Sequence, residues 1–252
     1  MAKLIVLGSS NAVPTSDHEN THLALLCRDR VVMIDCVSNP LVRLEQAGID
    51  PFAVTDLILT HFHPDHVSGV PLFLMDLWLI GRSTSLNVHG LAYTLDRVVA
   101  MMELYSWADW PNFYPINFCR VPLDEKATVF DDEDMCMSAS PVRHFLPNMG
   151  LRMDLKTEKK SIAYSCDTEP CAEVERLAQG ADILLHEAAG LYPGHSSAAQ
   201  AGEIARRAEV GTLYLIHYPT GRYASGDLVA EAKSAFPGDV RLAKDFMHIE
   251  VV

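Results

Sequence analysis

Residues 60–69 place three histidines and one aspartate within six positions, directly after a short apolar run. The apolar run, residues 57–59, is typical of a buried strand, and the long apolar stretch at residues 67–80 predicts a helix. The polar cluster therefore lies at a tight turn from a strand into a helix. Imidazole and carboxylate groups are the usual ligands of borderline divalent metals. Such a turn can direct several of them into one cavity, which predicts a metal site rather than a solvated loop.

Polar side chains also follow the ends of three predicted strands in the second half of the chain. Because loops at the carboxyl ends of neighbouring strands converge in α/β folds, these side chains are expected to reach the same cavity. Predicted helices at residues 197–209 and 228–236 alternate with the strands, as in an α/β layer. The strands and the polar residues after them are 161–166 with Asp167, 182–185 with His186 and Glu187, and 212–216 with His217.

The rest of the chain is expected to complete one domain of residues 1–252, because no repeat, low-complexity tract or linker interrupts it. Asn39 and Pro40 are typical of a helix start, and Gly48 of a helix end. The other predicted elements are a first strand at 1–8, a hairpin of 23–27 and 31–35 around 28–30, strands at 86–89, 118–122 and 135–142, a helix at 91–104, an aromatic loop at 105–114 and a closing strand at 240–252.

Composition argues against several classes of protein. The 20 Lys and Arg residues stand against 33 Asp and Glu, and the formal charge of -13 opposes strong non-specific binding to nucleic acid or to anionic lipid. The 6 cysteines form no Cys-x-x-Cys pair, which argues against a disulfide scaffold and favours the cytoplasm. No secretory cleavage pattern follows the N-terminus. Residues 67–80, interrupted by Asp76, fall short of the roughly 20 residues that span a bilayer, so no membrane association is expected.

Two metal ions would need more ligands than residues 60–69 provide. Each later histidine alone is more often a structural hydrogen-bonding residue, but the joint pattern of His and Asp at strand ends favours ligands. We expect one metal on His61, His63 and His144, a second on Asp65, His66 and His217, and Asp167 as the bridge between them.

The His-x-His-x-Asp-His motif at residues 61–66, with later His, Asp and His residues in the same order, resembles the metallo-β-lactamase superfamily over nearly the whole chain. Within that superfamily the sequence is most similar to ribonuclease Z, the transfer-RNA 3′-processing nuclease. The resemblance implies a four-layered αββα sandwich and two zinc ions, with manganese or iron as substitutes, on the ligands named above. Three later motifs support the resemblance to ribonuclease Z in particular: His-Glu-Ala at 186–188, His-Ser-Ser at 195–197 with Gln200 and Ala201, and Arg222 and Tyr223 after His217.

The resemblance also implies that His195 protonates the leaving oxygen of the substrate and that Glu187 orients His195. Residues 197–200 form a capping-box pattern, so His195 would precede a helix N-terminus whose dipole disfavours imidazolium. The negative charge of the Glu187 carboxylate would favour the imidazolium form again and so let His195 act as an acid. The alternative is that the two side chains only pin a loop. His186 is interpreted as structural, because neighbouring side chains on a strand point to opposite faces.

Two close divalent ions suit in-line attack by a metal-bound hydroxide on a phosphodiester. In that reaction Asp65 would accept a hydrogen bond from the hydroxide, and Arg222 would pair with a phosphate oxygen unless it is a solvated surface residue. A second hypothesis keeps the metals but makes the protein a lactonase, thioesterase or sulfatase, with the aromatic residues 107–114 as an apolar pocket wall. A third hypothesis is a non-catalytic metal-binding module.

Bacterial ribonuclease Z carries a long arm that grips transfer RNA, between the third metal histidine and the bridging aspartate. Here residues 150–167 predict a plain hairpin in that interval, so a small or cyclic phosphodiester or an RNA 3′ end is expected rather than a folded transfer RNA. Val37 and Cys166 stand where the family tends to have glycine. The resemblance also implies a homodimer, for which the apolar face of residues 67–80 could serve as core or interface equally well.

Overall fold

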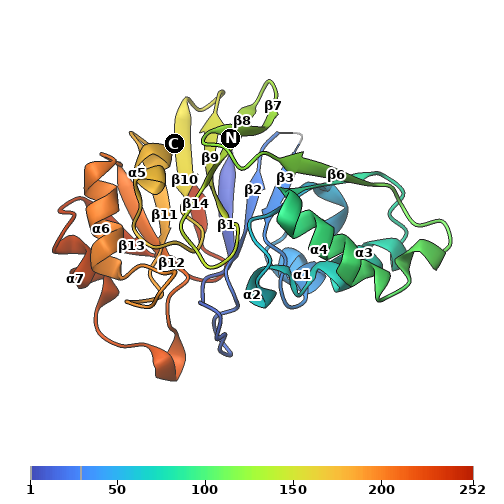
Figure 1. Cartoon of the computed structure of the whole chain (residues 1–252), viewed down its shortest axis with the longest axis horizontal. Helices are drawn as coiled ribbons and strands as arrows, with labels where there is room; N and C mark the ends of the chain where they lie inside the picture. The colour runs from blue at the N-terminus through green and yellow to red at the C-terminus, as the bar shows by residue number, and fades with distance from the viewer. Residues whose placement is uncertain (1, 29, 252) are drawn as a thin grey trace.

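Two seven-stranded sheets pack face to face in the computed structural model, which describes residues 2–28 and 30–251 (Figure 1). Each sheet combines a parallel part with an antiparallel part. The first sheet has the order β14 (His248–Glu250), β1 (Lys3–Gly8), β2 (His22–Leu26), β3 (Val31–Ile34), β4 (Val54–Leu59), β5 (Leu86–Leu91) and β6 (Ile116–Val121). The second has the order β13 (Asp239–Leu242), β12 (Thr212–Ile216), β11 (Ile183–Glu187), β10 (Lys160–Tyr164), β9 (Met149–Leu155), β8 (Met135–Pro141) and β7 (Ala127–Asp131).

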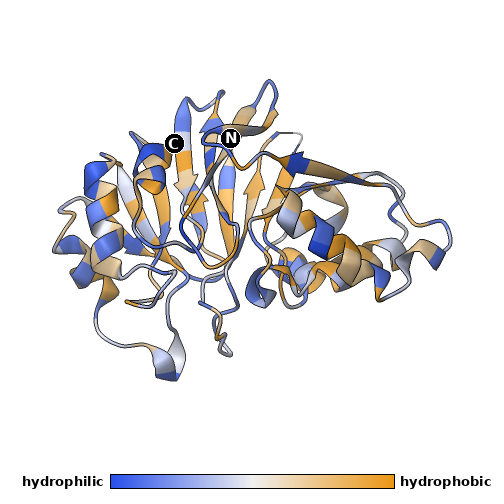
Figure 2. Ribbon diagram, in the orientation of Figure 1, coloured by the Kyte–Doolittle hydropathy of each residue, from blue (hydrophilic) through white to orange (hydrophobic). Residues whose placement is uncertain are grey.

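Helices cover the outer face of each sheet, and those on the second sheet turn polar sides outward (Figures 1 and 2). Those on the first sheet are α1 (Pro40–Gln46), α2 (Pro64–Val67), α3 (Val70–Leu79) and α4 (Ala92–Glu103), with the short turns η1 (Pro51–Ala53) and η2 (Trp107–Asp109). Those on the second sheet are α5 (Ala172–Ala178), α6 (Ala198–Arg207) and α7 (Leu228–Lys233), preceded by the short turn η3 (Gly221–Tyr223).

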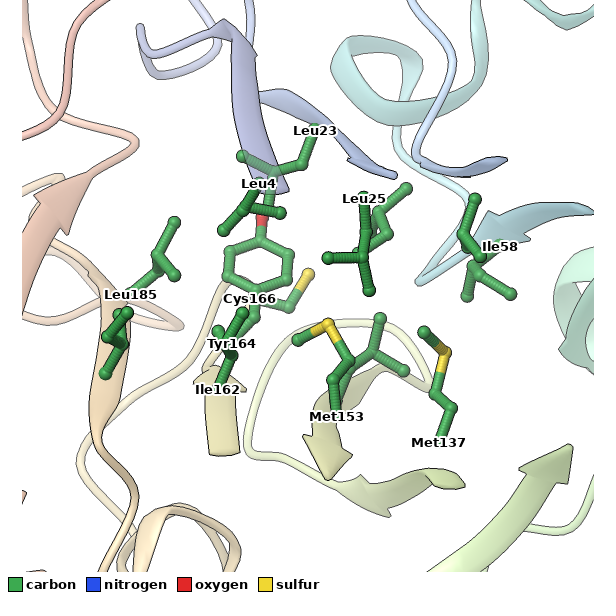
Figure 3. Packing of buried hydrophobic residues seen from close by; sticks show 14 of the residues in the cluster. Leu4, Leu23, Leu25, Ile58, Met137, Met153, Ile162, Tyr164, Cys166 and Leu185 are labelled. Carbon is green, nitrogen blue, oxygen red and sulfur yellow. The ribbon is translucent and has the colours of Figure 1, made fainter. Parts of the chain in front are cut away.

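The central strands are apolar on both faces because each face packs against another layer. In β1, Leu4 and Val6 lie between the two sheets, whereas Ile5 and Leu7 face the helices of the first sheet. Figure 3 shows Leu4 together with Tyr164 of the opposite sheet in the shared core. One core therefore joins the two sheets, and the predicted αββα sandwich is confirmed.

The helix expected at residues 67–80 is present as α3, but it begins at Val70, after a break that separates it from α2. The break lies at Gly69, whose N–H donates to the Cys36 carbonyl 2.9 Å away. A Cβ at this position would lie 2.7 Å from the carbonyl carbon of Val37, so only glycine fits against the turn after β3. The break sets the direction of α2, which carries Asp65 and His66, independently of α3.

The closing strand expected at residues 240–252 is divided between the two sheets, so that prediction is wrong. β13 lies at the edge of the second sheet and β14 at the edge of the first. Between them, Asp245 accepts hydrogen bonds from the N–H groups of Ser9 and Glu19 and from the Arg43 guanidinium. These bonds hold the chain where it passes from one sheet to the other.

The other elements lie close to the bounds expected from the sequence, apart from β7 and α5, which the sequence patterns did not predict. Between β8 and β10 the chain forms only the predicted hairpin, in which β9 and β10 are joined by residues 156–159. Among the described residues no helix is long and apolar enough to cross a membrane. Parts of the predicted first strand, hairpin turn and closing strand lie outside the described residues, namely Met1, Asp29 and Val252.

Candidate metal centre and active site

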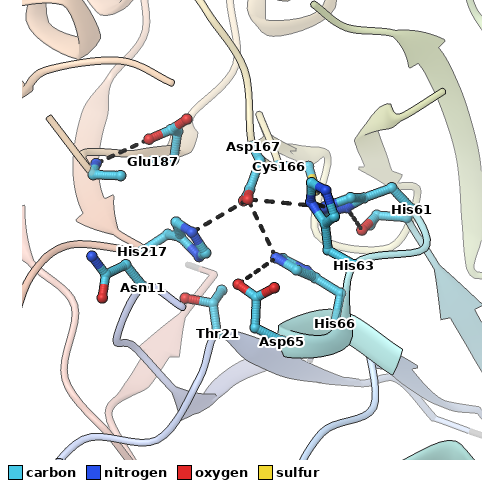
Figure 4. Close-up of polar contacts among 12 residues, drawn as sticks. Asn11, Thr21, His61, His63, Asp65, His66, Cys166, Asp167, Glu187 and His217 are labelled. Atoms are coloured by element: carbon cyan, nitrogen blue, oxygen red, sulfur yellow. Dashed lines mark hydrogen bonds and ion pairs between the residues drawn. The ribbon is translucent and has the colours of Figure 1, made fainter. Parts of the chain in front are cut away.

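The His-x-His-x-Asp-His segment leaves the end of β4 and enters α2 within four residues. Pro64 stands at the first position of α2, where its missing N–H costs no hydrogen bond. The helix begins there, so Asp65 and His66 lie in its single turn, while His61 and His63 lie on the extended segment before it. The strand end and the short helix thereby direct the four side chains toward one region (Figure 4).

Four residues from three separate loops form the first group of candidate ligands: His61, His63, His144 and Asp167. Their ligand atoms all lie within 4.8 Å of one another. The His63 Nδ1 atom lies 2.9 Å from His61 Nε2 and 3.0 Å from His144 Nε2. His144 follows β8 and Asp167 follows β10, as the strand-end pattern predicted.

The hydrogen bonds of the imidazoles show that these nitrogens present lone pairs rather than protons. His144 Nδ1 must donate to the Gly194 carbonyl at 2.7 Å, which leaves its Nε2 unprotonated. The Thr60 hydroxyl donates to Asp35 and therefore accepts from His61 Nδ1 at 3.2 Å, which leaves His61 Nε2 unprotonated too. Two lone pairs thus face a single nitrogen of His63, which can donate only one proton. Convergent lone pairs of this kind fit a bound cation.

The second group of candidate ligands is Asp65, His66, Asp167 and His217, and it shares Asp167 with the first. Asp167 Oδ2 lies 3.4 Å from His66 Nε2 and 3.3 Å from His217 Nε2 (Figure 4). His66 Nε2 and Asp167 Oδ1 are buried and have no hydrogen-bond partner among the described residues. Buried polar atoms are normally satisfied, so these two indicate a missing ligand such as a metal ion.

Electrostatics in this region favour positive charge beside Asp167. Burial lowers the pKa of His66, but the Asp167 and Asp35 carboxylates outweigh burial and raise it well above its ordinary value. Burial raises the pKa of Asp167, but His217 and His66 outweigh that effect and hold it well below its ordinary range. Burial, with His66, lowers the pKa of His61 well below its usual range, which keeps that imidazole neutral. The Asp167 carboxylate beside the neutral His61 imidazole suits a divalent cation.

Asp35, directly after β3, holds the candidate ligand His66 and was not predicted from the sequence. Its Oδ2 accepts the Nδ1–H of His66 at 2.7 Å, and its Oδ1 accepts the backbone N–H of Thr60 at 2.9 Å. The side chain is fully buried. The signal that found Asp167 and His217, a polar residue directly after a buried strand, also applies to Asp35.

Replacing Asp35 with asparagine is expected to weaken metal binding about 10- to 100-fold, because outer-shell carboxylates orient ligating histidines. Asparagine tolerates the positive φ of 62° at this position, so the backbone should be retained. Metal affinity would be measured by competition with a chromogenic chelator. Asp56→Asn is the matched control. Asp56 is also a buried aspartate that accepts a hydrogen bond from a histidine, His89 Nε2, at 2.9 Å, but it lies outside the metal centre. Equal loss of affinity in both variants would contradict the role given to Asp35.

Glu187 and His195 form a second polar pair beside the candidate ligands. The buried Glu187 carboxylate accepts His195 Nδ1–H at 2.9 Å and the N–H groups of Thr168 and Ala189, each at 2.9 Å. The His195 ring stacks on that of His217, with 5.8 Å between the ring centroids. Ser197 and Gln200 complete the predicted capping box at the start of α6. His195 therefore lies between the helix N-terminus and the carboxylate, as expected.

The Glu187–His195 pair is suited to holding a proton near neutral pH. Burial raises the pKa of Glu187 to about 7, against the opposing effect of its hydrogen bond with His195. Burial lowers the pKa of His195, but the hydrogen bond and charge of Glu187 outweigh it and raise the pKa above its ordinary value. A raised pKa suits His195 to the role of a general acid.

A cavity of about 500 Å³ opens onto both ligand groups and His195. Arg222 does not line it: this exposed residue lies on η3 and donates to the Tyr223 hydroxyl at 2.6 Å. The aromatic residues 107–114 do not line it either, so the apolar wall suggested for them is wrong. His186 is buried and its Nδ1 bonds the Glu187 carbonyl, in keeping with a structural role. The residues around the cavity are Asn11, Ala12, His63, Pro64, Asp65, Phe145, Asp167, Ala189, Tyr192, Pro193, His195 and His217.

Cys166 directly precedes the candidate bridging aspartate and adopts a φ of 51°. This left-handed conformation favours glycine, in keeping with the glycine that the resemblance implies at this position. The Cys166 thiol lies 3.7 Å from His61 Nδ1, and burial raises its pKa. Its sulfur also lies within 4.8 Å of ligand atoms of His61 and His66, so Cys166 is a buried side chain directly beside the centre.

A family model described as the beta-lactamase superfamily domain matches residues 30–218. The chain belongs to the beta-lactamase superfamily. Ribonuclease Z of Methanothermobacter thermautotrophicus is similar to it, with 27% identity over 307 residues that cover 100% of this chain and 97% of that protein. This superfamily and the likeness to ribonuclease Z are what the sequence motifs predicted, and both are confirmed.

Solved structures of this superfamily share the fold. The metallo-beta-lactamase fold protein YhfI from Bacillus subtilis superposes with a TM-score of 0.80 at 20% identity, covering 98% of both chains. Human tRNase Z, short form, superposes with a TM-score of 0.78 at 22% identity, covering 99% of both chains. The superfamily membership and the ligand clusters make the protein a metal-dependent hydrolase, as its sequence predicted.

Proposed function

We propose that this protein is a dinuclear metal phosphodiesterase of ribonuclease Z type, with zinc as the metal that its ligands suit best. One observation above all supports the proposal: the two ligand groups share Asp167, and both open with His195 into one cavity. The curated relative named ribonuclease Z adds weight to it. The residues that would hold the metals are His61, His63 and His144 for one ion, Asp65, His66 and His217 for the other, and Asp167 for both.

The bound ions would supply Lewis-acid activation of water and stabilisation of charge on phosphorus. The protein's own groups would position and move protons around them. Asp65 would accept a hydrogen bond from the attacking water and hold its orientation. His195 keeps its Nδ1 on Glu187, which leaves Nε2 to give a proton to the leaving oxygen. Glu187 acts through His195 as a positioning residue.

Replacing Glu187 with glutamine is expected to move the alkaline limb of the kcat profile to lower pH. The carboxylate raises the pKa of His195, so its removal lets His195 lose the catalytic proton at a lower pH. The activity is present while His195 is protonated and is lost as the pH rises through its pKa. The pH dependence of kcat and of thermal unfolding, measured together, checks this. A uniform fall in kcat at every pH, without a shift of the limb, would contradict it.

The substrate is proposed to be a small phosphodiester or an RNA 3′ end rather than a folded transfer RNA. Only a short turn joins β9 and β10, in the interval where bacterial ribonuclease Z carries its arm. The alignment with the archaeal ribonuclease Z runs over 307 positions against the 252 residues of this chain, so that relative contains residues without a counterpart here. Precursor transfer RNA is therefore expected to be a poor substrate. The cytoplasmic location and the homodimer remain predictions.

The direct test of the proposal is a panel of substrates given to protein of measured metal content. Bis-p-nitrophenyl phosphate would be compared with a p-nitrophenyl carboxylate ester, a lactone and a β-lactam. We expect the diester to be turned over with the highest kcat/KM. Full metal occupancy without turnover of the diester would overturn the proposal, and preferred hydrolysis of the ester or lactone would establish the second hypothesis instead.

A further inference from the structure

A second cavity, of about 620 Å³, adjoins the metal cavity and shares Ala189 and Tyr192 with it. It lies between the loop after β11 and the segment that joins β12 to α7. The same β11 loop carries His195, so the group that protonates the leaving oxygen lies next to the shared wall. A substrate with its phosphate at the metal centre could extend one ester substituent into this second cavity.

Aromatic and aliphatic side chains dominate the second cavity. Tyr192, Tyr218 and Tyr223 line it together with Leu228 and Leu242. Tyr192 is 66% exposed and Tyr223 is 46% exposed, so two large rings stand at its mouth without being part of the protein core. Pockets that bind organic ligands are typically lined in this way, and tyrosine rings offer flat faces for stacking.

The charged residues that line the second cavity are acidic, while the Arg222 guanidinium beside it is held on the hydroxyl of the lining Tyr223 at 2.6 Å. Among the described residues no Lys or Arg lines it, whereas Asp227 and Glu231 do. Both carboxylates are fixed in place: Asp227 caps α7 by accepting the Ala230 N–H at 3.0 Å, and Glu231 accepts the Ala199 N–H at 3.1 Å. A second phosphate of the substrate would meet these carboxylates and be repelled.

We propose that the second cavity binds an uncharged aromatic substituent of the phosphodiester, of the size of a nucleobase, and rejects a substituent that carries a further phosphate. This inference rests on the proposed function for the position of the scissile phosphate. It narrows the substrate to a diester with a single aromatic arm, such as a nucleoside phosphodiester, and excludes the interior of a polynucleotide. Tyr192 is the stacking residue at the junction of the two cavities, and Asp227 and Glu231 supply the charge selection.

The test measures Kd by calorimetry on the zinc-loaded protein, with phosphate monoesters that place one phosphate at the metal centre. The probes are methyl phosphate, thymidine 5′-monophosphate, thymidine 3′,5′-bisphosphate and phosphocholine. We expect thymidine 5′-monophosphate to bind about tenfold more tightly than methyl phosphate, since stacking of one base on an aromatic ring gives an effect of that order. The bisphosphate should bind several-fold more weakly than the monophosphate, by a margin that shrinks as salt is added.

Variants separate the two parts of the proposal. Tyr192→Ala should remove the preference for thymidine 5′-monophosphate over methyl phosphate, whereas Tyr105→Ala, at an exposed tyrosine outside both cavities, should leave it unchanged. Asp227→Asn with Glu231→Gln should remove the discrimination against the bisphosphate. Asparagine retains the acceptor that caps α7, so the helix should persist.

Three results would overturn the proposal: equal affinity for methyl phosphate and thymidine 5′-monophosphate, equal or tighter binding of the bisphosphate, or a gain for phosphocholine without one for the nucleotide. Because binding is measured without turnover, this test is independent of the diesterase assay. If the diester is turned over but all the phosphate monoesters bind with the same Kd, only the proposed role of the second cavity is wrong. If the monoesters show the expected order of Kd values but the diester is not turned over, only the proposed reaction is wrong.

Discussion

Replacing Asp167 with asparagine is expected to lower the kcat for diester hydrolysis by about 10³-fold or more. A loss of this size corresponds to several kcal/mol of the transition-state stabilisation that the metal ions would supply. Asp167 Oδ2 lies within 3.9 Å of the Nε2 atoms of His61, His66 and His217, so one side chain serves both ligand groups. The amide removes the negative charge that favours a cation between these imidazoles. The variant should therefore hold fewer metal ions than the unchanged protein.

Metal content by mass spectrometry and kcat on bis-p-nitrophenyl phosphate, measured on the same preparation, check this. Thermal unfolding would show that the variant is folded. Asp96→Asn is the matched control, because Asp96 is exposed and its pair with Arg120 is a surface ion pair of little energetic weight. If the Asp167 variant kept its full metal content and turnover, the shared-ligand account of the centre would be wrong.

Replacing His195 with alanine is expected to lower kcat about 10²- to 10⁴-fold on substrates with a poor leaving group, the usual contribution of a general acid. A dinucleoside phosphate needs protonation of its leaving alkoxide, whereas p-nitrophenolate leaves readily without a proton. The effect on bis-p-nitrophenyl phosphate should therefore be much smaller. His195 is not a member of either ligand group, so the metal content should not change.

The ratio of the two kcat losses distinguishes an acid from a residue that only pins its loop. A structural role would slow both substrates equally, and a loss of metal would show that His195 is a ligand. His248→Ala is the matched control, since His248 is an exposed histidine on β14. The alternative of a pinned loop would be established by equal losses on both substrates with full metal content.

Sequence alone predicted the candidate ligands because each follows a short apolar run. His61, His144, Asp167 and His217 lie in the loops just after β4, β8, β10 and β12, and the convergence of strand ends brings them together. The His-x-His-x-Asp-His motif spans only six residues, so it can be recognised even where the rest of the fold is predicted incorrectly. Asp35 shares the same signal, but without a histidine motif beside it a single aspartate after a strand is too common to stand out.

The features that sequence missed depend on contacts between distant segments. The break between α2 and α3 arises because Gly69 packs on the backbone of Val37. The periodicity of apolar residues does not predict a contact between such distant segments. The division of the last strand depends on Asp245, which bonds Ser9, Glu19 and Arg43 from the start of the chain. The second cavity is likewise formed by two loops far apart in sequence, so its tyrosines show no common pattern.

We expect phosphodiester hydrolysis to depend on two metal ions held around Asp167. This dependence is checked by adding zinc in steps to chelator-treated, metal-free protein and measuring turnover of bis-p-nitrophenyl phosphate at each step. We predict that turnover rises until two equivalents of zinc per chain are bound and then stays constant. Full turnover with one equivalent or none, or no turnover with two equivalents bound, would contradict the account.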